Sequence, residues 1–305
     1  MKLKLFTIFL FILAIPTYAC DVCSCYFGGA YLGILPQFDK NYIGINYYYR
    51  FFHSTHTSIF NTTQFSEETL QTIELRGKLN ASNKLSFLFL IPYNKNIQVG
   101  HDDEKLIGLG DVTLIGSYTL FDDINDLQNS KENIKDFVQV LKISTGLKLP
   151  TGKFNVSNLD NELNSNLQVG NGCTDLLLNA SYNCRYDKYG LNLNSDVKFS
   201  NESSNGLSVG NSFSSGINLF YLFRFEENTI LPIIGCVYEH YGKSTKNGNV
   251  NLNSGGNTFL TNLGFDLYFN SLTIGFNFQY PFSQFSDNSL SKLITRFNTN
   301  IYYKF

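Results

Sequence analysis

The 305-residue chain lacks tryptophan, has a single methionine, and is poor in charged residues, which make up 16% of it. Its net charge of −2 leaves no basic stripe or tail, so nothing in the sequence indicates nucleic-acid binding. Beyond the N-terminus, no apolar run approaches the roughly 20 residues that a transmembrane helix needs. The sequence therefore also excludes a bundle of membrane-spanning helices.

Aromatic residues and glycine are abundant by contrast, with 19 Tyr, 28 Phe and 24 Gly. Aromatic side chains favour β-strands, and in membrane β-barrels they gather in girdles at the two membrane interfaces. So many aromatics beside one methionine are unusual for a soluble enzyme. The composition favours a β-protein that meets a membrane.

We predict that residues 1–19 are a secretory signal peptide. Lys2 and Lys4 precede an apolar stretch that runs to Ile15, and a small residue stands directly before Cys20. Two alternatives stay open. One is a membrane anchor, which the shortness of the apolar run disfavours, and the other is a lipoprotein signal in which the cysteine is acylated.

Residues 20–40 form an N-terminal arm that is rich in cysteine and glycine and shows no structural period. Cys20, Cys23 and Cys25 lie within six residues, and such thiols are ligands for soft ions such as Cu(I) or Zn(II). This arm is the only metal or cofactor site that we predict. A local disulfide, or acylation of Cys20, explains the same residues.

The last stretch, residues 293–305, alternates between two kinds of side chain. One row is Leu293, Thr295, Phe297, Thr299, Ile301, Tyr303 and Phe305, and the other is Arg296, Asn298, Asn300, Tyr302 and Lys304. Successive side chains of a strand point to opposite faces, so one face is apolar and the other polar. Outer-membrane barrels commonly end on such a strand with a terminal Phe, through which we expect contact with the barrel-assembly machinery.

The same alternation recurs along the chain from residue 41. The expected strands are residues 41–51, 72–79, 87–93, 111–121, 138–149, 175–186, 189–199, 217–225, 230–240, 259–269, 272–280 and 293–305. Most connections alternate between long polar loops, such as 53–68, and short turns, although 122–136 is long where a turn was due. This pattern predicts one all-β domain over residues 41–305.

We predict that this domain is an antiparallel transmembrane β-barrel of about 12 strands in the bacterial outer membrane, surrounded by lipid. A soluble β-sandwich is the alternative. Charged residues recur on one face of almost every strand, and the strands exceed the usual five or six residues, which both disfavour a sandwich. A sheet in lipid cannot leave an open edge and must close.

A barrel of this size lies between filled eight-stranded barrels and open porins, which predicts a narrow or plugged lumen. The candidate lumen-lining residues are Arg50, Glu74, Arg76, Lys78, Asp111, Lys142, Lys148, Asp175, Arg185, Asp196, Lys198, Arg224, Asp266 and Arg296. They are either a path for a small polar or amphipathic solute, selected by constriction and charge, or a network of ion pairs that stiffens the barrel.

Three glycine-containing stretches resemble a known group of proteins: Gly108–Asp111, Gly146–Gly152 and Val169–Asp175. In this order and spacing they resemble the outer-membrane family named for the MetA pathway of phenol degradation, in a Bacteroidetes-type form. The resemblance spans residues 40–305 and implies a transporter-like barrel without assigned catalytic or binding residues. The chain departs from the pattern at Cys173, where a small residue without a thiol is expected.

Some twelve-stranded barrels are phospholipases that use Ser, His and a polar partner. His240 and Ser244 have no evident third member, so we expect no enzyme and no catalytic residues. Two functions are left. The first is a channel or transporter-like barrel that passes or binds a small solute through a narrow lumen of mixed charge, and the second is a metal-binding surface protein that uses the cysteine arm.

Overall fold

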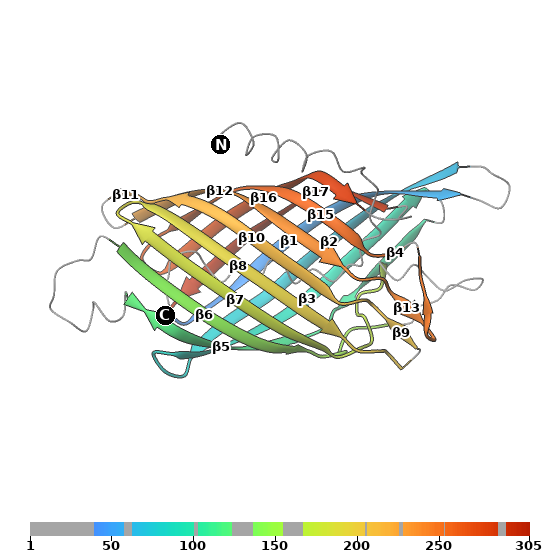
Figure 1. Ribbon diagram of the computed structural model, residues 1–305, viewed down its shortest axis with the longest axis horizontal. Helices are drawn as coiled ribbons and strands as arrows, with labels where there is room; N and C mark the ends of the chain where they lie inside the picture. The colour runs from blue at the N-terminus through green and yellow to red at the C-terminus, as the bar shows by residue number, and fades with distance from the viewer. Residues whose placement is uncertain are drawn as a thin grey trace, which may run out of the picture.

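The computed structural model describes residues 40–57, 63–100, 103–123, 137–154, 167–204, 206–225, 228–252, 254–285 and 291–305. These residues form a closed antiparallel β-barrel (Figure 1). Among them, no helix is long and apolar enough to cross a membrane. The predicted signal peptide and the three cysteines of the N-terminal arm lie outside the described residues.

Among the described residues, twelve strands make up the barrel wall. They are β1 (Tyr42–Thr57), β2 (Thr63–Asn80), β3 (Leu85–Gly100), β5 (Thr113–Asp122), β6 (Phe137–Lys148), β7 (Asp175–Tyr186), β8 (Tyr189–Ser200), β10 (Ser212–Tyr221), β12 (Asn228–Tyr241), β15 (Gly256–Tyr268), β16 (Leu272–Phe285) and β17 (Ser291–Lys304). Neighbours in the chain pair along the wall, β17 pairs with β1, and β10 pairs with β12, so the ring has no free edge.

Five short strands lie at the ends of the barrel. They are β4 (Glu104–Leu109), β9 (Leu207–Ser208), β11 (Phe223–Phe225), β13 (Thr245–Lys246) and β14 (Asn249–Val250). β4 pairs antiparallel with the part of β3 that lies beyond its pairing with β5, β11 pairs with β12, and the other three form a small separate sheet. The labels of β4, β9 and β13 lie at the end opposite the C-terminus (Figure 1). Short turns gather at the C-terminal end, which is therefore the periplasmic one.

All twelve predicted strands occur, but the loop predicted over residues 53–68 is mostly wrong. β1 continues to Thr57 and β2 begins at Thr63, so the two strands stay paired through this polar stretch. The Ser54 hydroxyl donates to Glu68 Oε1 at 2.8 Å, joining the two strands here. The polar side chains did not end the two strands, because the hydrogen bonds that pair β1 with β2 join backbone groups and do not require apolar side chains.

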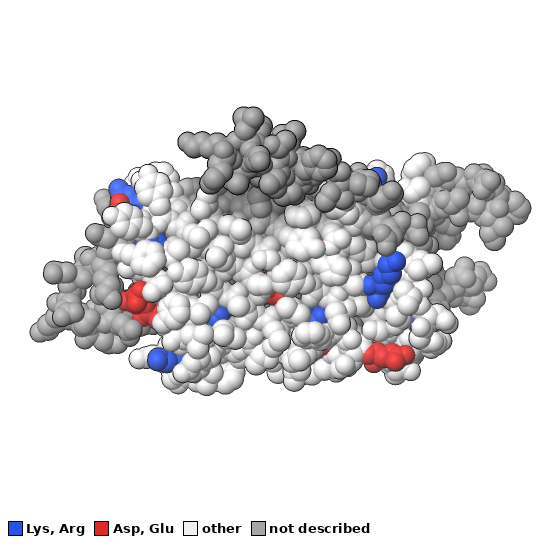
Figure 2. Space-filling model, in the orientation of Figure 1, with Lys and Arg blue, Asp and Glu red and all other residues white. Residues whose placement is uncertain are grey.

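The alternation places apolar side chains outside and polar ones inside. Ile45 and Leu263 are 54% and 49% exposed, whereas Asn46 and Asp266 are buried. Figure 2 shows few charged side chains across the middle of one outer face, with more of them toward its two ends. The outer wall thus has the apolar band that a bilayer requires.

The last strand departs from the predicted alternation at its start. Leu293, predicted on the outward row, is only 3% exposed and points inward. The pairing with β1 runs from Phe51 with Thr295 to Phe52 with Leu293, so Ile294 has no opposite residue. This β-bulge inserts one residue into β17 and reverses the faces on its far side.

An arginine in the middle of the outer wall should destabilise the barrel in a depth-dependent way. Leu263→Arg places a charge near the centre of β15 and should lower the free energy of unfolding in lipid vesicles by about 2–4 kcal/mol. Phe269→Arg, just beyond the periplasmic end of that strand, is the matched control and should cost at most about 1 kcal/mol. Denaturant titration checks both, and equal losses would contradict a membrane-spanning wall.

Candidate transport pathway

The predicted lumen-lining residues differ in how far the barrel encloses them. The buried ones are Glu74, Arg76, Lys78, Asp111, Asp175, Asp196, Lys198, Asp266 and Arg296. Arg50, Lys142, Lys148 and Arg185 are half-buried. Arg224 is exposed, because it lies in β11 beside the turn to β12. The barrel therefore encloses most of the predicted lumen-lining residues, and Arg224 is the exposed exception among them.

One group of enclosed side chains couples β1 to β2. Arg76, 1% exposed, donates from Nη2 to Glu74 Oε1 and to the Tyr48 hydroxyl, both at 2.8 Å. Asn46 Nδ2 donates to the same hydroxyl at 2.9 Å. The guanidinium is therefore held by a carboxylate and a phenol, and this group is a rigid part of the wall.

A second group crosses the lumen. Arg296 of β17 donates to Glu239 of β12 with two parallel bonds, Nη1 to Oε2 at 3.0 Å and Nη2 to Oε1 at 2.6 Å. Its Nε donates to Gln279 of β16, and the Tyr241 hydroxyl donates to Glu239 Oε2 at 3.1 Å. In the wall, β15 and β16 separate β12 from β17, so the ion pair is a chord across the interior.

The three glycine stretches converge on one carboxylate. Asp111 accepts the backbone N–H of Gly152 and that of Asn171, each at 2.9 Å. Lys148 Nζ lies 2.8 Å from Asp175 Oδ2 and 3.7 Å from Asp111 Oδ2, so it bridges the two acids. Segments that are far apart in the sequence are thereby fixed at one point of the wall.

Cys173, where the chain departs from the family pattern, lies next to this cluster of acidic residues. Its buried thiol donates to Asp175 Oδ1 at 3.3 Å. The thiols of Cys184 and Cys236 lie on the outward rows of β7 and β12 and form no disulfide. Within the described ranges, no three His, Cys, Asp or Glu side chains could hold a metal ion. Metal binding by Cys20, Cys23 and Cys25 stays a prediction.

The segment that precedes Gly170, residues 167–169, lies inside the barrel. Asn94 of β3 donates to the carbonyl of Val169 at 2.8 Å, and Asn96 donates to that of Leu167 at 2.9 Å. The Leu167 side chain is 1% exposed and belongs to one apolar cluster. The cluster consists of Phe52, Leu70, Leu167, Val237, Leu260 and Leu293, and we call it the apolar septum.

The septum spans the barrel from wall to wall. Going round the ring either way, five strands separate β3 from β12, so these two strands face each other. The segment at Leu167 hydrogen-bonds to β3, and the cluster that contains it includes Val237 of β12. Residues 167–169 and the apolar side chains together therefore cross the lumen.

The septum was not predicted from the sequence. Leu70 and Leu260 each stand between polar neighbours on an inward row, and Leu167 lies in a loop with no period. The available signal was the ninth predicted strand, 230–240, whose alternation is weak because it is apolar on both rows. A second inward cluster, formed by Phe220, Leu222, Leu231, Ile233 and Tyr268, shares that strand.

Comparison with solved structures finds a likeness of fold. The COG4313 outer membrane channel from Pseudomonas putida F1 superposes with a TM-score of 0.64 and 17% identity, covering 92% of this chain and 100% of that one. The β domain of the Bordetella autotransporter BrkA gives a TM-score of 0.48 and 12% identity, covering 88% and 100%. No family model matches the chain, and no curated protein matches its sequence.

The chain is an outer-membrane β-barrel. Its even strand number, its closed antiparallel ring and its apolar outer wall are the properties that the bacterial outer membrane demands.

Removing the arginine of the chord should leave a buried carboxylate without its partner. Arg296→Met is expected to lower the free energy of unfolding by about 3–5 kcal/mol, because Glu239 stays enclosed. Arg224→Met, at an exposed arginine, is the control and should change little. Urea unfolding in detergent or vesicles measures both, and an equally small effect for both would show that the chord does not stabilise the barrel.

Gly170 should tolerate no side chain. A Cβ there would lie 2.8 Å from Asp111 Oδ1 and 2.8 Å from the carbonyl carbon of Gly152. Gly170→Ala should cost about 1–3 kcal/mol through this overlap. Gly116→Ala is the control, because its Cβ would meet the Phe87 ring at an ordinary 3.7 Å. Thermal unfolding of both variants tests the expectation, which is wrong if they unfold alike.

Proposed function

We propose that this chain is an outer-membrane channel that passes a small solute through a narrow lumen, with the apolar septum as its constriction. The observation that carries the proposal is an apolar layer set between polar ones. On the inward row of β2, Glu68 and Thr72 stand on either side of Leu70. On that of β15, Thr258 and Asn262 flank Leu260 in the same way. Hydrophobic constrictions between wetted regions limit passage by excluding water.

On its loop side the septum is held to β3 by side-chain hydrogen bonds and not by strand pairing. Leu167 reaches the cluster from a segment that hydrogen-bonds to β3 through two asparagine side chains. The wall, by contrast, is held by continuous strand pairing. A small displacement of residues 167–169 therefore opens a path while the barrel stays intact. The fold likeness to an outer membrane channel agrees with this function.

The solute that we propose is small and polar or amphipathic, since both kinds of lining occur. The barrel encloses charged side chains such as Arg76 and Asp196 as well as apolar ones such as Leu88 and Ile115. We further propose membership of the phenol-degradation family of outer-membrane proteins. The three glycine stretches that carry the resemblance meet around Asp111, and this supports the proposal. Their contact explains why glycine and aspartate occur together in these stretches.

Shortening the septum side chain should enlarge the path. Leu167→Ala is expected to raise single-channel conductance in planar bilayers, and the swelling rate of liposomes in small sugars, severalfold. Leu219→Ala, which trims an outward side chain that is 56% exposed, should leave both unchanged. If neither the unaltered barrel nor Leu167→Ala passes ions or sugars, the channel proposal fails. Conductance without any effect of Leu167→Ala would instead remove the septum from the path.

A further inference from the structure

Two asparagine side chains of β3 hold the backbone of the segment that carries Leu167. Asn96 Nδ2 donates to the carbonyl of Leu167 at 2.9 Å and to that of Gln168 at 3.3 Å. Asn94 Nδ2 donates to the carbonyl of Val169 at 2.8 Å. Residues two apart on a strand point to the same face, so both amides reach the segment from one side. We call these two side chains the amide clamp.

The Thr72 hydroxyl anchors one half of the amide clamp. Thr72 of β2 lies directly opposite Asn94, and it is 7% exposed. Its hydroxyl donates to Asn94 Oδ1 at 2.7 Å, which leaves the Nδ2 atom of the same amide facing the carbonyl of Val169. Arg50 Nη2 donates to Thr72 Oγ1 at 3.4 Å, so the hydroxyl hydrogen is left for Asn94. The amide is therefore bonded through both its oxygen and its nitrogen.

Gly110 closes the other side of the Asn94 amide. A Cβ on Gly110 would lie 2.5 Å from Asn94 Nδ2 and 3.0 Å from the carbonyl oxygen of Val169. The Gly110 N–H donates to the carbonyl of Pro92 at 2.9 Å, which holds this glycine against β3. The absence of a side chain at Gly110 thus leaves the room in which the hydrogen bond between Asn94 and Val169 forms.

The amide clamp lies beside the apolar septum and determines where Leu167 stands. Asn96 is directly opposite Leu70, and Thr72 stands two residues from Leu70 on the same inward row. Of the six septum side chains, five project from strands of the wall and only that of Leu167 does not. Strand pairing fixes the other five in place. Leu167 can leave the septum once its segment is released, because water can then hydrate the freed carbonyls.

We propose that Thr72 is a positioning residue for the constriction of the channel. It fixes the Asn94 amide against Val169 and thereby keeps Leu167 in the apolar septum. This inference rests on the channel function proposed above, and it adds control of opening by polar side chains that do not belong to the septum. Loss of the hydroxyl should make the open state more frequent. The width of the open path should stay the same, because every septum side chain is retained.

Thr72→Val removes the hydroxyl at nearly constant volume and should free one half of the clamp. Deuterium uptake by the peptide that contains residues 167–172, measured on the full-length barrel, should become about fivefold faster, the factor expected for the loss of one hydrogen bond. In planar bilayers the ratio of open to closed time should rise by a similar factor, at unchanged single-channel conductance. Thr72→Ser, which keeps the hydroxyl, should behave as the unaltered barrel does.

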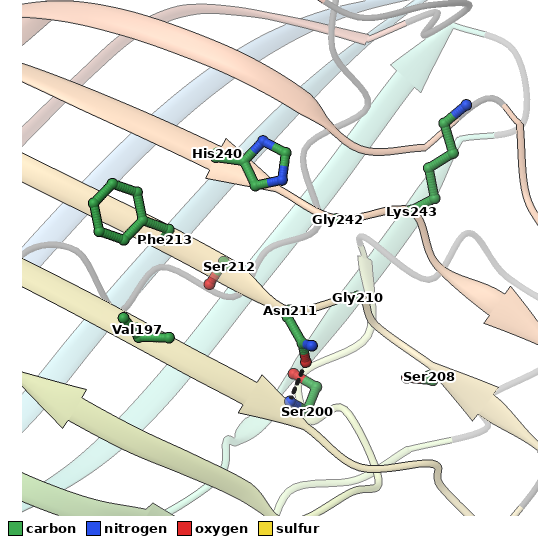
Figure 3. A pocket seen from close by; sticks show the side chains of 10 residues that line it. All are labelled: Val197, Ser200, Ser208, Gly210, Asn211, Ser212, Phe213, His240, Gly242 and Lys243. Atoms are coloured by element: carbon green, nitrogen blue, oxygen red, sulfur yellow. Dashed lines mark hydrogen bonds between the residues drawn. The ribbon is translucent and has the colours of Figure 1, made fainter.

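Two controls separate the clamp from a general loss of stability. Thr273→Val removes a threonine hydroxyl that is also 7% exposed, from the inward row of β16 near its periplasmic end, and should change neither measurement. Asn94→Leu removes the amide and is a second variant should Thr72→Val not fold, which heat-modified gel migration reveals. Its control is Asn211→Leu, just before β10, where Asn211 Oδ1 accepts the backbone N–H of Ser200 at 3.0 Å and so joins β10 to β8 (Figure 3).

Three results would overturn the proposal. Unchanged deuterium uptake in Thr72→Val and Asn94→Leu would show that the clamp does not hold the segment. Faster uptake with an unchanged ratio of open to closed time, in a barrel that conducts, would show that the segment does not close the path. If uptake becomes faster but no barrel conducts, the unaltered one included, the channel function itself fails and the clamp has no path to control.

Discussion

The barrel depends on one constraint, which is that lipid offers no hydrogen-bond partner to a peptide group. β1 therefore pairs with β17 along almost its whole length, and β10 pairs with β12, so that the ring closes. Closure also creates an inside with opposite walls. The chord from Arg296 to Glu239 and the septum both join strands that are not neighbours, and neither could form on an open sheet.

Mixed charge inside the barrel follows from the same enclosure. A charge taken out of water is stable only when it is paired and hydrogen-bonded, so the enclosed positions of the barrel hold charges of both signs. Lys148 between Asp111 and Asp175, and Arg76 against Glu74, are such pairs. The sequence predicted these residues on one face but left open whether they serve a solute or the wall. Their contacts favour a structural role for these groups, and the proposed constriction is therefore the apolar septum.

Strands and their faces could be predicted because alternation is a local property. Leu263 and Asp266 needed only their neighbours in sequence to be placed outside and inside. The inward turn of Leu293 could not be predicted, because the bulge at Ile294 depends on register with Phe52 at the other end of the barrel domain. Leu167 escaped prediction for a similar reason. Its neighbours in the loop say nothing of five strands that supply its apolar partners.

β12, the strand with the weakest alternation, contributes side chains to both inward apolar clusters. On β12, Leu231, Ile233 and Val237 point inward, while Ile230 and Ile234 face the lipid. The inward row of a wide, water-filled pore would have to be polar throughout, since water would cover it. Here the inward row packs instead against Phe220 and Tyr268 near one end and joins Leu167 in the septum. The loss of alternation in this strand is thus the sequence signature of inward apolar side chains that pack against one another.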